Sequence, residues 1–173
     1  MNNFKDMYIF KPTASSCGRG IRIISKKQTV SKRPGTLVQK YVSKPHLLRG
    51  YKYDMRLYIL VTCFEPLKAY IFEQGLVRLA TVPYSTSKGN LKKRFIHLTN
   101  FSVNKKNDQY KKNTTQILSG SDPDKQTEVL DEMSSKWSLA QLREEYDKTG
   151  VSYSDVFKNI KDLCVKTLMA VEP

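Results

Sequence analysis

The chain of 173 residues has the size of one domain, and its 39% hydrophobic and 10% aromatic content is too apolar for an intrinsically disordered protein. It has no apolar run long enough to cross a bilayer, no secretory leader and three scattered cysteines, so we expect a cytoplasmic protein without membrane association, disulfides or a zinc site. Its formal net charge of +14 predicts attraction to polyanions, which include nucleic acid, anionic membranes and acidic protein segments.

Three short strands are predicted near the start of the chain. The first two, at residues 8–12 and 21–24, are joined by a flexible loop at residues 13–20, and the third, at residues 37–42, is apolar enough to be largely buried. A strand after the loop differs from the helix that follows the loop in Walker and Rossmann phosphate sites. Lys11 ends the first strand, where its ammonium could meet phosphate oxygens. From local sequence alone, a solvated edge-strand lysine is the simpler interpretation.

The clearest alternation of apolar and polar residues in the chain occurs at residues 52–62, which predicts one strand. One face is apolar and predicts a core, whereas the other carries Lys52, Asp54 and Arg56. These ionisable groups could form a solvated outer face. With Arg78 on a neighbouring strand, they could instead bind phosphates and substrate carboxylates, and the spacing favours neither interpretation.

An antiparallel meander is predicted next, with strands at residues 67–72 and 76–80 after a turn. Two polar stretches, residues 85–94 and 104–131, predict long loops. Helical periodicity predicts two final helices, at residues 137–147 and 154–171, the second with an apolar stripe that includes Leu163. The expected fold class is therefore α+β, with an antiparallel sheet and flanking helices.

Residues 95–100 form a short apolar segment that ends in Thr99 and Asn100, whose hydroxyl and amide could contact a ligand. No acidic or nucleophilic partner is suggested for His97, so we interpret it as a structural histidine and not as an acid–base catalyst. Gly18-Arg19-Gly20 could belong to a kinase glycine-rich loop, but the HRD and DFG motifs of protein kinases are absent. The RNP motif of RNA-binding domains is absent as well.

Several short motifs follow one another along the chain. They are YIFKP from Tyr8, GRGI from Gly18, LVQKY from Leu37, KYDMRLY from Lys52, GLVR from Gly75 and HLTN from His97. In this order they resemble the tubulin tyrosine ligase-like family, most closely its tubulin polyglutamylase branch. The resemblance runs from about residue 8 to residue 107 and, more loosely, through the two final helices.

The resemblance implies an ATP-grasp fold, in which ATP lies between two α+β lobes. Residues 1–173 would form the central part and part of the C-terminal lobe of this domain, incomplete at both ends. The implied reaction phosphorylates a carboxylate with ATP, and an amine attacks the acyl phosphate to form an amide bond. The carboxylate would belong to a glutamate side chain in the acidic tail of tubulin or another Glu-rich protein, and the amine to free glutamate.

The family motifs also imply roles for individual residues. The ATP phosphates would be bound by Lys11, Arg19 and Gly20, and the adenine by Gln39, Lys40, Tyr41 and Val42. The same pocket would be lined by Lys52, Tyr53 and Asp54. Beside the reacting phosphate would lie Thr99 and Asn100. The catalytic residues would be Arg56, Arg78 and Asn100, because fixed donors stabilise the charge that develops on phosphoryl and tetrahedral oxygens. The free amino acid would be bound by Arg78, Phe101, Ser102 and Lys136. Related sequences usually carry Tyr at the position of Phe101, so a hydroxyl contact to the amino acid is lost.

The resemblance implies Mg²⁺ as a second cofactor, with ligands expected beyond Pro173 and none in this chain. We therefore expect little ligase activity from these residues alone. A glycine or tyrosine ligase of the same fold stays open as an alternative, as does a non-catalytic basic module that binds microtubules or nucleic acid, of which nucleic acid is the less expected partner. A tubulin ligase would act at the cytoskeleton, or at a cilium or basal body.

Overall fold

The computed structural model describes residues 7–25, 34–111 and 134–171, which belong to two compact units. Unit 1 comprises Met1–Asp54 and Arg78–Lys136, and unit 2 comprises Met55–Val77 and Trp137–Pro173. Antiparallel strands and helices are both present, so the predicted α+β class is confirmed. In the described part of the chain, none of the helices combines the length and the hydropathy that a membrane span needs.

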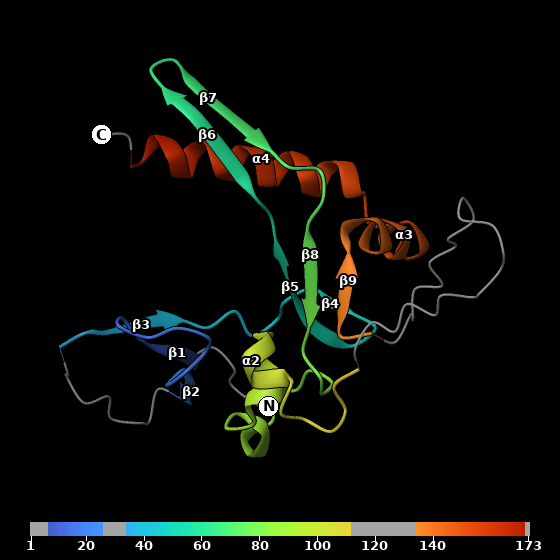
Figure 1. Cartoon of the computed structure of the whole chain (residues 1–173). Helices are drawn as coiled ribbons and strands as arrows, with labels where there is room; N and C mark the ends of the chain where they lie inside the picture. Colours follow the sequence, from blue (N-terminus) through green and yellow to red (C-terminus); the bar gives the residue numbers. More distant parts are fainter. Residues whose placement is uncertain (1–6, 26–33, 112–133, 172–173) are drawn as a thin grey trace, which may run out of the picture. The chain divides into compact units, whose positions relative to one another are not determined.

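A three-stranded antiparallel sheet belongs to unit 1 and has the order β2-β1-β3 (Figure 1). Its strands are β1 (Met7–Pro12), β2 (Arg22–Ser25) and β3 (Thr36–Lys40). In the pairing of β1 with β3, Lys11 lies opposite Leu37. Met7, Ile23 and Tyr41 form a buried cluster of this region, and Ile9 packs against it, so β1 and β2 both contribute to a core.

The predicted burial of residues 37–42 is wrong for most of the segment. Leu37, Val38 and Val42 are 50%, 41% and 68% exposed, whereas Tyr41 is buried. The reason is that β3 lies at the edge of its sheet, with β1 on one side and no further strand among the described residues on the other. Apolar and β-branched residues favour the extended backbone here without entering a core.

A second sheet has the order β4-β5-β8-β9. Its strands are β4 (Leu47–Leu48), β5 (Tyr51–Arg56), β8 (Leu76–Leu79) and β9 (Lys136–Ser138). Three of these strands contain residues of both units. The residues that belong to unit 1 are β5 up to Asp54, β8 from Arg78 onward and Lys136 of β9, and the other residues of these three strands belong to unit 2. Within unit 1, the backbone N–H of Ala80 donates to the carbonyl of Lys52 at 2.8 Å, which continues the pairing just beyond β8.

The single strand predicted at residues 52–62 is two strands. β5 ends at Arg56, and β6 (Ile59–Phe64) begins after a short break and pairs in a different sheet. The face predicted to be core is half-buried at best, and Ile59 is 39% exposed. Alternation identifies the two faces of a strand, but it does not show where the chain leaves one sheet for another.

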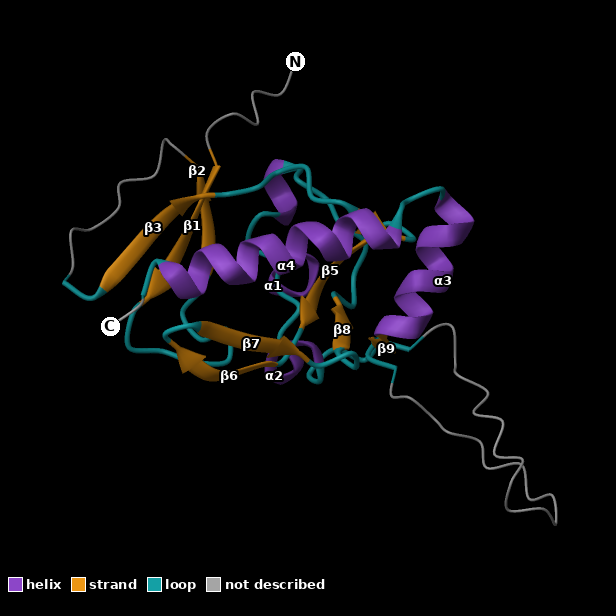
Figure 2. Ribbon diagram, turned by 90° about the horizontal axis from the view of Figure 1, so that it is seen from above, coloured by secondary structure: helices purple, strands orange, loops and turns teal. Residues whose placement is uncertain are grey.

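An antiparallel hairpin in unit 2 consists of β6 and β7 (Leu67–Ile71), which lie side by side in Figure 2. A bulge between Val61 and Cys63 shifts the pairing register. The predicted turn between these strands is confirmed. The meander is wrong beyond it, because β7 pairs with β6 whereas β8 lies between β5 and β9 among the described strands.

Short helices replace part of the predicted loops in unit 1. They are the 3-10 helix η2 (Lys88–Asn90), α1 (Arg94–His97) and α2 (Phe101–Asn104). The polar stretch at residues 85–94 therefore contains η2 and the start of α1. The stretch at residues 104–131 begins in α2, and from residue 112 it lies outside the described residues.

The side chain of Asn104 holds the turn before α2 against the end of β8. Its Oδ1 accepts hydrogen bonds from the backbone N–H and the hydroxyl of Thr81, at 3.0 and 2.8 Å. Its Nδ2 donates to the carbonyls of Leu98 and Asn100, at 2.7 and 3.1 Å. Asn104 is 1% exposed, so these bonds replace water for an amide that would otherwise be costly to bury.

The first of the two predicted C-terminal helices is α3 (Leu139–Thr149). It begins later than predicted because Trp137 lies in β9, and Ser138 then forms a capping box with Gln141. Gly150 ends the helix with a φ of 73°, a left-handed conformation that glycine adopts at little cost. The packing face of α3 includes Leu142, which is 0% exposed.

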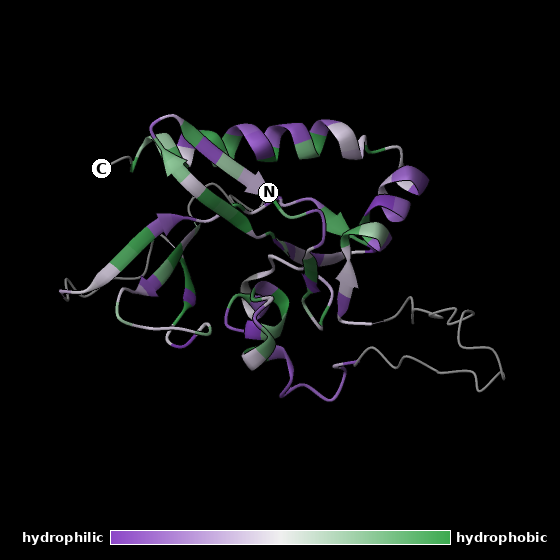
Figure 3. Ribbon diagram, turned by 45° about the horizontal axis from the view of Figure 1, so that its top comes forward, coloured by the Kyte–Doolittle hydropathy of each residue, from purple (hydrophilic) through white to green (hydrophobic). Residues whose placement is uncertain are grey.

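The second predicted helix is α4 (Tyr153–Met169), with Ser152 as its N-cap. Figure 3 shows hydrophobic and hydrophilic residues alternating along it, as its periodicity predicted. None of its residues is buried, however, and Leu163 on the predicted apolar stripe is 64% exposed. Near its start, the rings of Tyr153 and Phe157 stack with centroids 5.5 Å apart.

Candidate active site

Lys11 at the end of β1 lies beside Gln39 of β3. Lys11 Nζ donates to Gln39 Oε1 at 2.9 Å, and the two side chains lie diagonally across the strands because Gln39 pairs with Ile9. Both residues were expected at ATP, and the sheet register brings them together. Lys40 and Val42, which were expected at the adenine, are exposed.

Lys52 of β5 extends into a partly buried polar cluster. Its Nζ donates to the carbonyl of His97 at 2.9 Å and to the hydroxyl of Tyr41 at 3.3 Å. The Tyr41 hydroxyl lies 3.1 Å from His97 Nδ1 and 3.4 Å from the hydroxyl of Tyr84. His97 Nε2 lies 3.2 Å from the carbonyl of Asn90, which can only accept, so we assign the proton to Nε2 and the acceptor role to Nδ1. Both ring nitrogens thus have partners, in agreement with a structural histidine.

The environment of this cluster changes how its members titrate. Burial lowers the pKa of Lys52; the Asp54 carboxylate acts in the opposite direction, and the charge of Lys11 lowers the pKa further. Burial also lowers the pKa of His97 and raises the pKa of Tyr41. His97 and Tyr41 are therefore uncharged at neutral pH. An anion bound near Lys11 and Lys52 would relieve the repulsion between the two ammonium groups.

Asp54 and Arg78 form an ion pair across the adjacent strands β5 and β8. Arg78 Nε donates to Asp54 Oδ1 at 3.1 Å, and Arg78 Nη2 donates to Asp54 Oδ2 at 2.5 Å, with side chains 17% (Arg78) and 33% (Asp54) exposed. This two-pronged contact orients the guanidinium plane. Lys52, Asp54 and Arg78 all belong to unit 1, as half-buried residues, whereas Arg56 is exposed and belongs to unit 2.

The loop at residues 13–20 is attached to α1 and α2 through its backbone carbonyls. Arg94 Nη2 donates to the carbonyl of Gly18 at 2.6 Å, and Ser102 Oγ donates to the carbonyl of Cys17 at 2.8 Å. Gly18 has a φ of 76°, and a Cβ there would lie 2.9 Å from Asn100 Oδ1. The glycine thus allows the loop, which was expected at phosphates, to approach Asn100 closely.

Two lysines surround Phe101, which is 43% exposed at the start of α2. The ammonium of Lys136 lies 4.3 Å from the centre of the Phe101 ring, and that of Lys105 lies 5.5 Å from it. The ring edge contacts Tyr110 with centroids 5.7 Å apart. Phe101 and Lys136, both expected at the free amino acid, are therefore neighbours, whereas the hydroxyl of Ser102 is bonded to the glycine loop.

The described residues suit anionic phosphates better than a metal ion. Lys11, Lys52 and Arg78 supply positive charge, which matches phosphate oxygens. Within the described ranges, no three His, Cys, Asp or Glu side chains gather in a way that could hold a metal. The carboxylate of this cluster, Asp54, is engaged by Arg78, so these residues do not fit a magnesium site.

Sequence reasoning missed three residues that organise this region, namely Tyr84, Arg94 and Asn104. Arg94 follows Lys92 and Lys93, and no local signal shows which of these cations contacts the glycine loop. Tyr84 and Asn104 lie at the borders of polar stretches that look like loops in the sequence. Their partners lie up to 43 residues away along the chain, so contacts in three dimensions are needed to recognise them.

The chain is similar to known proteins over nearly its whole length. The family model described as "Tubulin-tyrosine ligase family" matches residues 1–172. Human tubulin monoglutamylase TTLL4 (Homo sapiens) is 40% identical over 169 residues, which are 98% of this chain and 13% of that protein. Human tubulin polyglutamylase TTLL5 is 36% identical over 165 residues, 95% of this chain and 12% of that protein. Tubulin polyglutamylase TTLL7 of Mus musculus is 37% identical over 167 residues, 96% of this chain and 17% of that protein. The chain thus spans less than a fifth of the length of each of these relatives.

Proposed function

Because the chain belongs to the tubulin-tyrosine ligase family, whose fold is ATP-grasp-like, we propose that it contributes the nucleotide site of a ligase that attaches glutamate to the side chains of glutamates in acidic tubulin tails. The relatives named above are tubulin mono- and polyglutamylases, which supports glutamate as the amino acid and tubulin as the acceptor. The net charge of +14 would speed the encounter with such tails. The enzyme would act where tubulin is found, in the cytoplasm and at the cytoskeleton.

The nucleotide assignment rests on the excess of positive charge in one cluster of side chains. Lys11, Lys52 and Arg78 belong to the same unit, and the carboxylate that accompanies them is Asp54, which is paired with Arg78. This cluster therefore has an excess of positive charge, part of it desolvated. A nucleotide triphosphate would neutralise the excess, and charge-assisted hydrogen bonds in a partly buried site are stronger than at a solvated surface.

The ligation would proceed through transfer of the terminal phosphoryl group of ATP to the acceptor carboxylate. The amino group of free glutamate would then attack the acyl phosphate and form the amide bond with release of phosphate. Arg78, oriented by Asp54, would stabilise the negative charge that develops on the reacting oxygens. Lys11 and Lys52 would bind phosphates, and Mg²⁺, which would neutralise phosphate charge, would be held by residues outside those described.

The free glutamate would lie at Phe101 and Lys136. The ammonium of Lys136 is held above the Phe101 ring, where it could bind a substrate carboxylate. Phe101 offers an apolar surface to the methylene groups of the substrate. The hydroxyl of Ser102 is already bonded to the Cys17 carbonyl, so we assign it to loop positioning.

A transfer assay with the full-length enzyme tests this function. Labelled glutamate, glycine and tyrosine are supplied separately with ATP, Mg²⁺ and tubulin. We expect incorporation of glutamate. Arg78→Ala should lower kcat/KM by roughly 100- to 1000-fold, the usual effect of removing a donor that stabilises a charged transition state. Arg143→Ala, at an exposed position on α3, is the matched control and should retain activity.

Incorporation of glycine or tyrosine without glutamate would contradict the proposal. Full activity of Arg78→Ala would remove this arginine from the catalytic site, and the absence of any ATP-dependent transfer would favour a binding module.

A further inference from the structure

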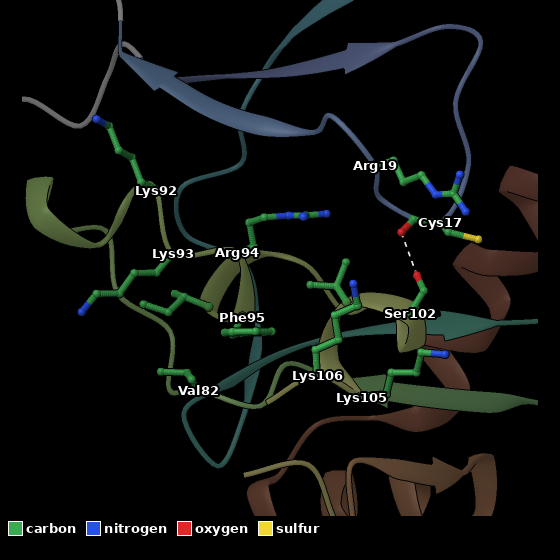
Figure 4. A pocket seen from close by; sticks show the side chains of 12 residues that line it. Cys17, Arg19, Val82, Lys92, Lys93, Arg94, Phe95, Ser102, Lys105 and Lys106 are labelled. Atoms are coloured by element: carbon green, nitrogen blue, oxygen red, sulfur yellow. Dashed lines mark hydrogen bonds between the residues drawn. The ribbon is translucent and has the colours of Figure 1, made fainter. Parts of the chain in front are cut away.

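Unit 1 contains a cavity of about 670 Å³ that the proposed chemistry leaves unexplained (Figure 4). It is lined by the glycine loop, by the segment that leads into α1, and by α2 with the residues after it. Its cationic lining residues are Arg19, Lys92, Lys93, Arg94, Lys105 and Lys106, and none of the described lining residues is acidic. Lys11, Lys52 and Arg78 do not line it, and Arg19 is the one described lining residue that was expected at ATP.

Most of this positive charge is available to a ligand. Arg94 donates to the Gly18 carbonyl, but Lys92, Lys93 and Lys106 are exposed and form no ion pair with any described carboxylate. Like charges placed around one cavity repel one another, and a ligand with several negative charges would relieve that repulsion.

The residue types in the lining and the distribution of their charge favour an acidic peptide over nucleic acid. Its apolar part includes Val82, Ile96 and Val103, and its one aromatic residue among those described is Phe95, which is half-buried. Single-stranded nucleic acids are usually bound by exposed aromatic rings on which bases stack, and the described lining residues include no exposed ring. In Figure 4, Lys92 and Lys93 lie across the cavity from Arg19 and Lys105, so positive charge is distributed along its length. An extended peptide with successive acidic side chains suits that distribution.

The cavity shares two elements with the proposed reaction site, the glycine loop and α2. Arg19 belongs to the glycine loop, and Ser102, which also lines the cavity, links that loop to α2 through the Cys17 carbonyl. At the same wall, the ammonium of Lys105 lies 5.5 Å from the centre of the Phe101 ring, where free glutamate is proposed to bind. A chain in the cavity would therefore have one end beside the phosphate loop.

We propose that this cavity binds the acidic acceptor segment, with the carboxylates next to the reacting glutamate held by Lys92, Lys93, Lys105 and Lys106. This inference rests on the proposed function and adds to it the site that selects an acceptor with several acidic residues. The reacting carboxylate would enter past Arg19, and its neighbours along the peptide would occupy the cavity.

The experiment compares two double variants of the full-length enzyme that remove the same charge. Lys92→Gln with Lys93→Gln changes the cavity, and Lys68→Gln with Lys148→Gln changes exposed lysines of unit 2. A fluorescent glutamate-rich peptide, titrated by anisotropy, measures acceptor binding, and steady-state assays measure the KM for peptide, ATP and glutamate. Because each exposed ion pair contributes only a few-fold, we expect the cavity variant to weaken peptide binding and raise the peptide KM by roughly five- to tenfold. The KM for ATP and glutamate should change by less than about twofold, and the control variant should behave like the parent.

Three results would overturn the inference. Equal weakening by both double variants would mean that peptide attraction depends on overall charge, and a rise in the KM for ATP would assign the cavity to the nucleotide. Stronger binding of a single-stranded oligonucleotide than of the peptide, lost in the cavity variant, would make it a nucleic-acid site. If no amino acid is transferred at all, the proposed function fails, yet the anisotropy comparison still decides whether the cavity binds acidic peptides.

Discussion

Both units have mainly apolar cores, but they differ in the polar side chains that they bury. In unit 1, His97 and Asn104 are 2% and 1% exposed, and both have hydrogen-bond partners. In unit 2 the core is mainly apolar, with Val77 and Leu142 at 0% exposed and Leu139 at 4%. None of the buried side-chain nitrogen and oxygen atoms in the described residues lacks a hydrogen-bond partner.

This difference shows how a small region can hold several cations close together. Directional bonds such as those of Asn104 fix loops that present charged side chains, whereas apolar packing fixes the elements without fixing the direction of any polar group. Unit 1 thus combines a mainly apolar core with buried, hydrogen-bonded polar side chains such as Asn104. Unit 2 buries one polar residue among those described, Glu145.

The largest effects are expected from variants that replace one core residue in each unit. Asn104→Ala leaves the Thr81 and Leu98 backbone groups without partners, and Leu142→Ala creates a cavity, so each should lower the free energy of unfolding by about 3 kcal/mol. Only Asn104→Ala should also weaken ATP binding, by roughly tenfold, because the Leu98 to Asn100 turn loosens. Urea denaturation and a nucleotide titration measure the two effects. An equal loss of ATP affinity in Leu142→Ala would break the distinction between the units.

A smaller effect is expected from three glycines of unit 1 that differ in surroundings. At Gly18, an alanine would have to adopt a φ of 76°, and its Cβ would lie 2.9 Å from Asn100 Oδ1. At Gly50, an alanine would have to adopt a φ of 85°, but its Cβ would lie in open space. At Gly89, an alanine would have neither problem. We expect losses of stability of about 2 to 3, about 1 and about 0 kcal/mol, respectively. Thermal unfolding gives this order, and a Gly18→Ala protein as stable as Gly89→Ala would show that the loop does not need its close approach to Asn100.

The smallest effect is a pH dependence of stability. Burial and the charge of Lys52 lower the pKa of His97, so the unfolded chain takes up a proton below about pH 6.5 that the folded state does not yet bind. Stability should therefore fall as the pH drops from 6.5 toward the lowered pKa, and should not change from this cause above pH 7.5. Urea midpoints at several pH values should show a weaker decline in His97→Gln. The same decline in parent and variant would assign the pH dependence to other groups.

Local patterns were reliable for several elements of the fold. Alternation and turn residues located β1, β2 and the β6-β7 hairpin, and helical periodicity located α3 and α4. At the candidate site, the sequence placed Asp54 and Arg78 on neighbouring strands, as β5 and β8 are, but it did not predict their ion pair. The same rules were wrong for the exposed strand β3 and for the break after Arg56, because both depend on which strands pair and not on the residues of one strand.

By itself, the sequence determined the family, the fold class and the excess of positive charge, because ordered motifs and composition are properties of the chain alone. The tertiary structure decided which of the many cations meet. Arg94 contacts a carbonyl 76 residues away and Ser102 one 85 residues away, and Lys92 and Lys93 come to line the same cavity as Arg19. Such contacts follow from how strands and loops pack together, which no local spacing encodes.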